Sequence, residues 1–233
     1  MNGGSVRVWD PFIRVFRWSL AVLFATAWLT EEEGWLHEWA GYGVLALIAA
    51  RIAWGVVGPR HARFTDFVRS PLAALGYLRG LLDGSARRAL GHNPAGGWMA
   101  ILLLATLLVT GGSGVIVLGL EGAGPLAGRI DAGNPLVTLV GGAAGEDEAH
   151  GAEDRAPAAY GEEEYGEEEE EEHDESVPPG LEGAEEAWEE IHELAANLAL
   201  VLVILHVLGV LASSLAHREN LVRAMITGRK RAE

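Results

Sequence analysis

Four long stretches of mainly apolar residues alternate with polar, Gly-rich or charged segments along the chain. They run from Phe12 to Leu29, Glu38 to Val57, Gly97 to Leu120 and Ile191 to Leu215. Each approaches the ~20 residues that a helix needs to cross the ~30 Å hydrocarbon core of a bilayer. The pattern predicts an all-α fold: one membrane domain with four transmembrane helices packed as a bundle.

Two of the connecting segments have their own character. The segment Ser70 to Asp83 begins with a helix-capping Ser and a Pro, and then repeats Leu at helical spacing, which predicts a short amphipathic helix on the membrane surface. The segment Gly141 to Gly183 is rich in Gly, Ala and Glu and has no apolar period. Because such a sequence cannot bury enough apolar surface to fold alone, we expect a disordered acidic loop.

The positive charges predict an orientation across the membrane. Six Arg lie between Gly58 and Asn93, and five Lys or Arg follow Leu215, whereas the two opposite connections together hold only Arg129 and Arg155. Since loops rich in Lys and Arg stay in the cytoplasm, both termini are expected inside and the acidic loop outside.

Composition excludes several classes of protein. The chain has no Cys, which excludes disulfide scaffolds, iron–sulfur proteins and c-type cytochromes. Its net charge of −16 is concentrated between Glu121 and Glu193, a segment with 24 acidic and 2 basic residues. The remainder is mildly basic and very apolar. The sequence contains no phosphate-binding Gly loop, nucleophile triad or nucleic-acid patch, so no catalytic residue and no nucleic-acid partner are expected.

Three His residues lie within or at the edge of the apolar stretches, where ionisable residues are costly and are candidates for function. His192 and His206 are fourteen residues apart on one predicted helix, so they share a face and stand ~21 Å apart along the axis. This separation suits two haem sites at different depths and is too long for one metal ion. His37 lies at about the depth of His192, so we expect these two to ligate one iron. The alternative for each His is an interhelical hydrogen bond.

Several strings identify a family resemblance. VWDPFIRVFRW, LHEWAGYGVLALIAARIAWGVVGPRHARF, GHNPAGG and SSLAHRENLVRAMITGRKR resemble the prokaryotic cytochrome b561 family, which includes the cytochrome b subunits of nickel–iron hydrogenases. The resemblance implies an inner-membrane cytochrome of the respiratory chain with two b haems, each held between two His. Such proteins transfer electrons between quinone and a redox partner. By position, His37 and His192 match the ligands of the outer haem, and His206 matches one ligand of the inner haem.

The chain departs from the family pattern in the first span. Where the family has His in a Phe-His-Trp string, this chain has Arg17, and a guanidinium has no accessible lone pair for iron. The inner haem is then absent, five-coordinate through His206, or ligated by a substitute such as Met99. Arg17 itself would pair with a haem propionate or a lipid phosphate. Otherwise Arg17 snorkels to the cytoplasmic surface and His206 is a packed residue.

The remaining His residues carry weaker predictions. His61, His92 and His217 lie among Arg residues at the inner surface and are interpreted as ordinary interfacial residues, although quinone or haem propionates could use them. His150 and His173 lie in the acidic loop, interpreted as a solvated segment that could steer a basic partner such as a c-type cytochrome.

The expected function is electron transfer by a haem b protein, with one or two haems, in contact with lipid and quinone. Two alternatives remain: a haem-poor membrane anchor of a larger complex, and a cation-handling membrane protein that uses the acidic loop.

Overall fold

The computed structural model describes residues 5–31, 34–59, 62–86, 89, 91–141, 177 and 180–231. Most of the acidic segment predicted to be disordered, with His150 and His173, lies outside these residues, as does His61. The chain divides into two compact units, one formed by residues 1–111 and 194–233 and the other by residues 112–193. Each unit is described by itself.

Four long helices confirm the all-α prediction: α1 (Pro11–Leu29), α2 (Gly34–Val57), α5 (Pro94–Leu120) and α7 (Glu182–Ala216). All four are long and apolar enough to cross a membrane. Many of their large apolar side chains face outward; Val22 is 62% exposed. An outer surface of this kind is typical of helices that face lipid.

In the first unit all four helices pack around one apolar core. Val44 and Ile48 of α2 meet Leu107 of α5 and Ala199 of α7, while Leu20 and Leu23 of α1 pack against the edge of the cluster. Small residues permit close approach: a Cβ on Gly43 would lie 2.8 Å from Leu23. Gly43 therefore lets α1 and α2 approach closely.

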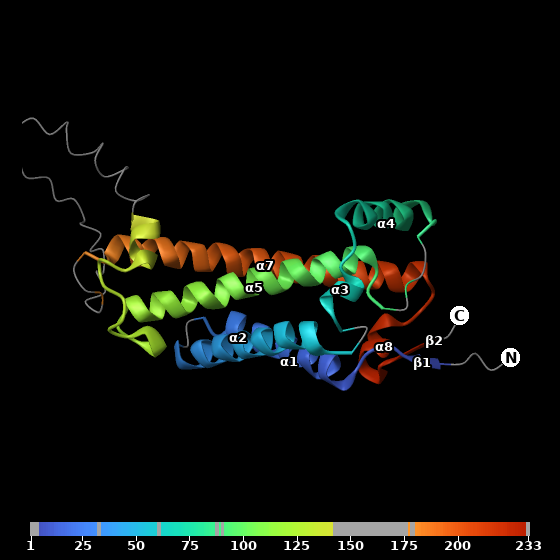
Figure 1. The fold of residues 1–233 in the computed structure, drawn as a ribbon, viewed down its shortest axis with the longest axis horizontal. Helices are drawn as coiled ribbons and strands as arrows, with labels where there is room; N and C mark the ends of the chain where they lie inside the picture. Colours follow the sequence, from blue (N-terminus) through green and yellow to red (C-terminus); the bar gives the residue numbers. More distant parts are fainter. Residues whose placement is uncertain are drawn as a thin grey trace, which may run out of the picture. The chain divides into compact units, whose positions relative to one another are not determined.

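The two termini of the chain lie together. Strand β1 (Ser5–Arg7) pairs antiparallel with β2 (Arg229–Arg231), and both ends are on the same side of the first unit (Figure 1). Helix α8 (Leu221–Thr227) leads into β2 and ends at Gly228, which has φ +74°. The Gly228 carbonyl accepts hydrogen bonds from the Val8 and Trp9 amides. A Cβ on Gly228 would lie 2.8 Å from the Trp9 carbonyl oxygen, so Gly fits this approach.

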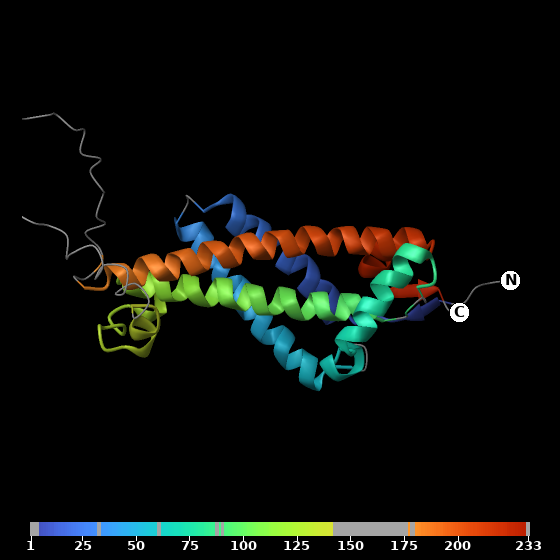
Figure 2. The same cartoon turned by 90° about the horizontal axis from the view of Figure 1, so that it is seen from above.

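Two short helices connect α2 to α5. Helix α3 (Phe64–Phe67) is followed by α4 (Pro71–Asp83), which Ser70 caps by accepting from the Ala73 amide, as the sequence predicts. Helix α4 lies outside the four long helices (Figures 1 and 2). Its Tyr77 hydroxyl lies 3.2 Å from the Ser213 hydroxyl and 3.3 Å from His217 Nε2, which attaches α4 to the C-terminal end of α7.

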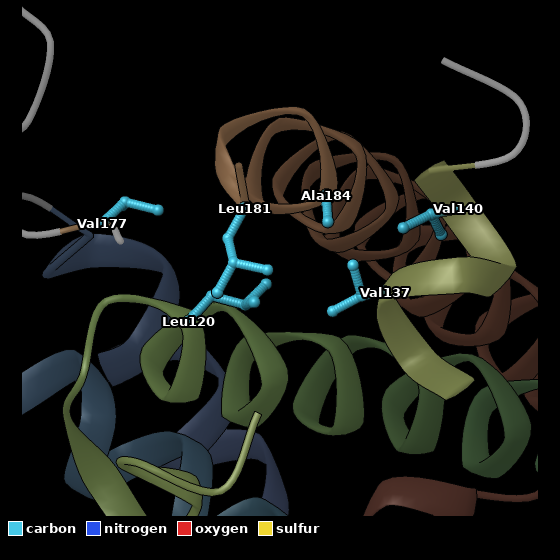
Figure 3. Close-up of a cluster of buried hydrophobic side chains, with 6 residues drawn as sticks. All are labelled: Leu120, Val137, Val140, Val177, Leu181 and Ala184. Atoms are coloured by element: carbon cyan, nitrogen blue, oxygen red, sulfur yellow. The ribbon is translucent and has the colours of Figure 1, made fainter. Parts of the chain in front are cut away.

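The second unit is a small apolar cluster at the adjoining ends of α5 and α7. After α5 the chain forms the 3-10 helix η1 (Gly124–Leu126) and a helical segment over residues 135–141. In Figure 3 the Leu120 and Leu181 side chains point toward each other, and Val137 and Val140 of the helical segment face Ala184. The Trp188 indole N–H donates to the Leu136 carbonyl at 3.1 Å.

This unit corrects two predicted boundaries. The acidic segment was expected to be disordered through Gly183, but Val177 and Leu181 are buried and α7 begins at Glu182. The fourth helix therefore starts nine residues before the predicted Ile191. Its first turn contains Glu182 and Glu185, where the helix dipole favours negative charge. The other three long helices begin one to four residues before their predicted starts and end where expected.

Candidate functional site

The position of His92 follows from how helix α5 begins. Asn93 Oδ1 accepts a hydrogen bond from the Gly96 amide at 2.6 Å, and Pro94 is the first helical residue. Asn caps and Pro at the first position are strong helix-start signals. The string Gly-His-Asn-Pro therefore fixes His92 directly before the helix, at the end of the first unit that holds the termini.

Arg17 and His92 form the centre of this site. Arg17 Nη2 on α1 donates to His92 Nε2 at 2.9 Å, across 75 residues of sequence. The guanidinium carbon also lies 4.3 Å from the centre of the Trp9 ring. The His92 ring meets Trp9 edge-on, with centroids 4.7 Å apart, and Phe67 at 4.5 Å. Arg17 is thus held by a hydrogen bond and by a cation–π contact.

The hydrogen bond determines the tautomer of His92. A guanidinium can only donate, so Nε2 accepts and the proton of the neutral ring lies on Nδ1. Nδ1 is buried and has no hydrogen-bond partner among the described residues. Burial lowers the pKa of His92 well below its usual value, and the positive charges of Arg17 and Arg51, followed by His206 and Lys230, lower it further. His92 therefore stays neutral at pH 7 and remains an acceptor for Arg17.

A cavity opens beside this pair, entirely within the first unit. Its volume is about 70 Å³. Arg17 and His206 both line it, so the structure brings together the two positions that the family resemblance assigns to the inner haem. Lys230 and Glu219 also line the cavity although each is nearly buried. The Lys230 ammonium donates to the Ala89 carbonyl at 3.1 Å.

The side chains around this cavity do not fit a haem held between two imidazoles. Three His line it, but His92 is engaged by Arg17 and His217 by Tyr77. Among the described residues, His206 is then the lining imidazole without a hydrogen bond. Met99, predicted as a substitute ligand, is not among the residues that line the cavity. Met225 of α8 is, and the sequence interpretation did not consider it.

His37 lies near the start of α2, within the first unit. Its Nδ1 lies 2.9 Å from the Ala27 carbonyl oxygen of α1. Since a carbonyl only accepts, Nδ1 carries the proton and Nε2 carries the lone pair. This is the arrangement of His ligands in metalloproteins, where the second nitrogen donates to a carbonyl or carboxylate and fixes the ring.

His192 is held in a comparable way within the second unit. Its Nδ1 lies 3.3 Å from the hydroxyl oxygen of Ser113, a residue only 2% exposed. Its ring also rests against the backbone of α5 at Gly114, where a Cβ would lie 2.9 Å from Cε1 and 3.1 Å from Nδ1. Gly114 therefore makes room for the imidazole, and Ser113 fixes its orientation.

The donor sets of His37 and His192 therefore fit axial ligation of haem iron. The two residues belong to different units, and their pairing on one iron stays a prediction. Within the described ranges no group of three or more His, Asp or Glu comes together as a site for a bare metal ion.

The sequence interpretation missed the role of His92, which it treated as an ordinary interfacial residue. A local signal for His92 was present in the sequence, because Gly-His-Asn-Pro places it at a helix start with strong capping residues. The partner could not be found in the same way, because Arg17 lies on another helix 75 residues earlier.

A comparison with protein families gave a match. Residues 8–228 match the family model described as prokaryotic cytochrome b561. The match spans nearly the whole chain, including Arg17, His92 and the three membrane His residues. Neither the comparison with curated proteins nor that with solved structures found a match.

Proposed function

Because the chain belongs to the prokaryotic cytochrome b561 family and is a membrane b-type cytochrome in electron transfer, we propose that it passes electrons between the quinone pool and a redox partner on the outer, periplasmic face. Four helices suited to membrane spanning are compatible with that role. The bound haem supplies one-electron redox chemistry, while the protein supplies ligands, orientation and a low-dielectric enclosure.

The observation that carries this proposal is that a hydrogen bond holds Nδ1 of each of two membrane His residues. His37 and His192 would hold the outer haem iron through Nε2, because the Nδ1 atoms are engaged by the Ala27 carbonyl and the Ser113 hydroxyl. These hydrogen bonds fix the ring planes and tune the basicity of the ligands. The interhelical hydrogen bond and the ligand role, weighed as alternatives from sequence, are therefore compatible.

At the inner haem position, this proposal expects no iron held between two His residues. Arg17 replaces the expected ligand and is engaged with His92, so the chain carries one six-coordinate haem. The same observation favours the haem-poor anchor as a second candidate. The two candidates differ in whether the outer haem exchanges electrons with quinone.

In this proposal the protein lies in the bacterial inner membrane, with both termini in the cytoplasm and the acidic segment on the outer face. The pairing of β1 with β2 supports one shared side for the termini, and the basic loops favour the cytoplasmic side. Because the chain has no Cys, single Cys residues at Ser5 and Gly145 can be labelled without background. A membrane-impermeant maleimide should label Gly145→Cys and spare Ser5→Cys in intact spheroplasts; the reverse pattern contradicts the orientation.

The redox proposal is tested with the purified protein under anaerobic conditions. A reduced quinone should reduce the b haem, and the absorbance change should approach that produced by dithionite. Reduction by dithionite with none by quinol favours the anchor. A matched variant, Ser113→Ala, keeps the iron ligand while removing its hydrogen bond, so it should alter the extent of quinol reduction through the haem potential.

A further inference from the structure

Arg17 is a buried cation without a carboxylate partner. One of its five N–H donors binds His92, and no acidic side chain forms an ion pair with it in the part of the chain that the structure describes. Asp10, an acidic residue near it, uses Oδ1 to accept from the Ile13 amide and cap α1. Burying a charge costs free energy unless the charge is paired. An anion from outside the described residues would therefore stabilise the guanidinium.

The cavity beside Arg17 provides space and further positive charge for such an anion. Lys230 and the polar side chain of Asn93 line the same cavity, and Glu219 is its one acidic lining residue. Arg51 is 4% exposed nearby, with Nη1 lacking a partner among the described residues. Burial lowers the pKa of His92 most, and the positive charges of Arg17, Arg51, His206 and Lys230 lower it further. The local potential is therefore positive.

Two of the helices that line this cavity also expose apolar side chains. Helix α4 contributes Tyr77 to the lining and carries an exposed Leu stripe at helical spacing: Leu72, Leu75, Leu78 and Leu82. Helix α8 contributes Leu221 and Met225 to the lining, and its Ile226 is 53% exposed. A cationic cavity lined by helices that also expose apolar side chains fits an amphiphile, whose headgroup meets the charges while its acyl chains meet apolar surface.

We propose that this cavity binds the phosphate group of an anionic phospholipid, with Arg17 as its main counter-ion. Arg17 presents its remaining donors to the phosphate oxygens and Lys230 adds a second positive charge. His92 holds the guanidinium in place from the other side. The Arg that stands in place of the expected iron ligand then forms a lipid site at the inner level. This lipid site does not depend on the identity of the redox partner.

The proposal is tested on the full-length protein reconstituted with phosphatidylglycerol or phosphatidylcholine and then washed in detergent. Phosphatidylglycerol should be retained at about one molecule per chain, counted by phosphorus analysis and mass spectrometry, and it should raise the thermal midpoint. Arg17→Gln should lower retention by about tenfold, the size expected for a lost charge-assisted hydrogen-bond partner. Glu219→Gln should strengthen retention by removing the negative lining residue.

Arg79→Gln is the matched control, since it removes one Arg from α4 at an exposed position outside the cavity lining. It should retain lipid as the wild type does. Arg17→Lys keeps the charge and should retain more lipid than Arg17→Gln, so a folding defect in the Gln variant does not decide the result. Inorganic phosphate is added in a parallel arm; if it raises the thermal midpoint as much as phosphatidylglycerol does, the phosphate chemistry holds and the source is free phosphate.

Two results would overturn the proposal. One is equal retention of phosphatidylglycerol by the wild type and Arg17→Gln. The other is a wild type that retains no phospholipid while Arg17→Gln lowers the haem content, because the counter-ion would then be a haem propionate.

Discussion

Arg17 donates to Nε2 of His92 at 2.9 Å, and this bond occupies the position where the family pattern has an iron-ligating His. The interaction uses a donor that cannot bind iron and an acceptor nitrogen that otherwise could. It thereby removes two candidate ligands at once and leaves His206 across the same cavity.

Restoring the first-span imidazole should create a second low-spin centre. In Arg17→His the new ring faces the cavity that His206 lines, so a bis-imidazole site becomes available. Low-temperature electron paramagnetic resonance should show a new low-spin signal. Arg14→His, one turn earlier on α1 and outside the cavity lining, should give the wild-type spectrum. If the wild type already shows two low-spin centres and Arg17→His leaves them unchanged, another residue completes the inner site.

The outer haem should depend on both predicted ligands. His37→Ala and His192→Ala should each abolish its low-spin b-type spectrum, because one imidazole cannot maintain six-coordination. His173→Ala is the control, as it removes a His from the acidic segment. A normal low-spin spectrum in either ligand variant would refute the assignment. Added imidazole should restore part of the signal if the cavity left by the side chain is intact.

A Gly-to-Ala pair on helix α5 tests the orientation of His192. In Gly114→Ala the new methyl group would lie 2.9 Å from His192 Cε1, so the ring must move. We expect a weakened iron bond, with haem affinity lower by roughly 10–100-fold, as for other changes around ligands. In Gly112→Ala, two residues away, the methyl group has no neighbour within 4 Å. Both variants gain the same helix propensity, so a haem titration that distinguishes them isolates the contact.

The acidic segment should steer a basic redox partner. Residues Gly161 to Glu175 hold 11 acidic side chains and no Lys or Arg. The rate of electron transfer to a basic c-type cytochrome should fall at least ~10-fold from low to high salt, because attraction between distant charges is screened. A Gly/Ser segment of the same length in place of Gly161 to Glu175 should remove most of this dependence. Equal salt responses would contradict the steering role.

Much of this fold is predictable because membrane helices are encoded locally. Apolar length gave the four spans, and a capping Ser followed by Pro gave α4 at its observed bounds. The start of α7 was misplaced since Glu182 and Glu185 share the composition of the preceding acidic segment. Their helical state depends on the burial of Leu181 and Ala184 in the second unit, which local composition does not reveal.

The parts that could not be predicted depend on contacts distant in sequence. Strands β1 and β2 pair across more than two hundred residues, from Ser5 to Arg231, and three-residue strands carry no periodic signal. The chemistry of Arg17 could be read from the sequence, since an Arg cannot ligate iron. Its engagement with His92 could not, because it requires knowing how α1 packs beside the start of α5.

The central claim, one six-coordinate haem with an inner level altered by Arg17, is tested most directly by counting haems. Wild-type protein is purified in mild detergent, its haem-to-protein ratio is measured by the pyridine haemochrome method, and low-spin centres are counted by electron paramagnetic resonance. The account predicts one low-spin haem b per chain, with any additional haem high-spin. Two low-spin haems per chain in the wild type would contradict it.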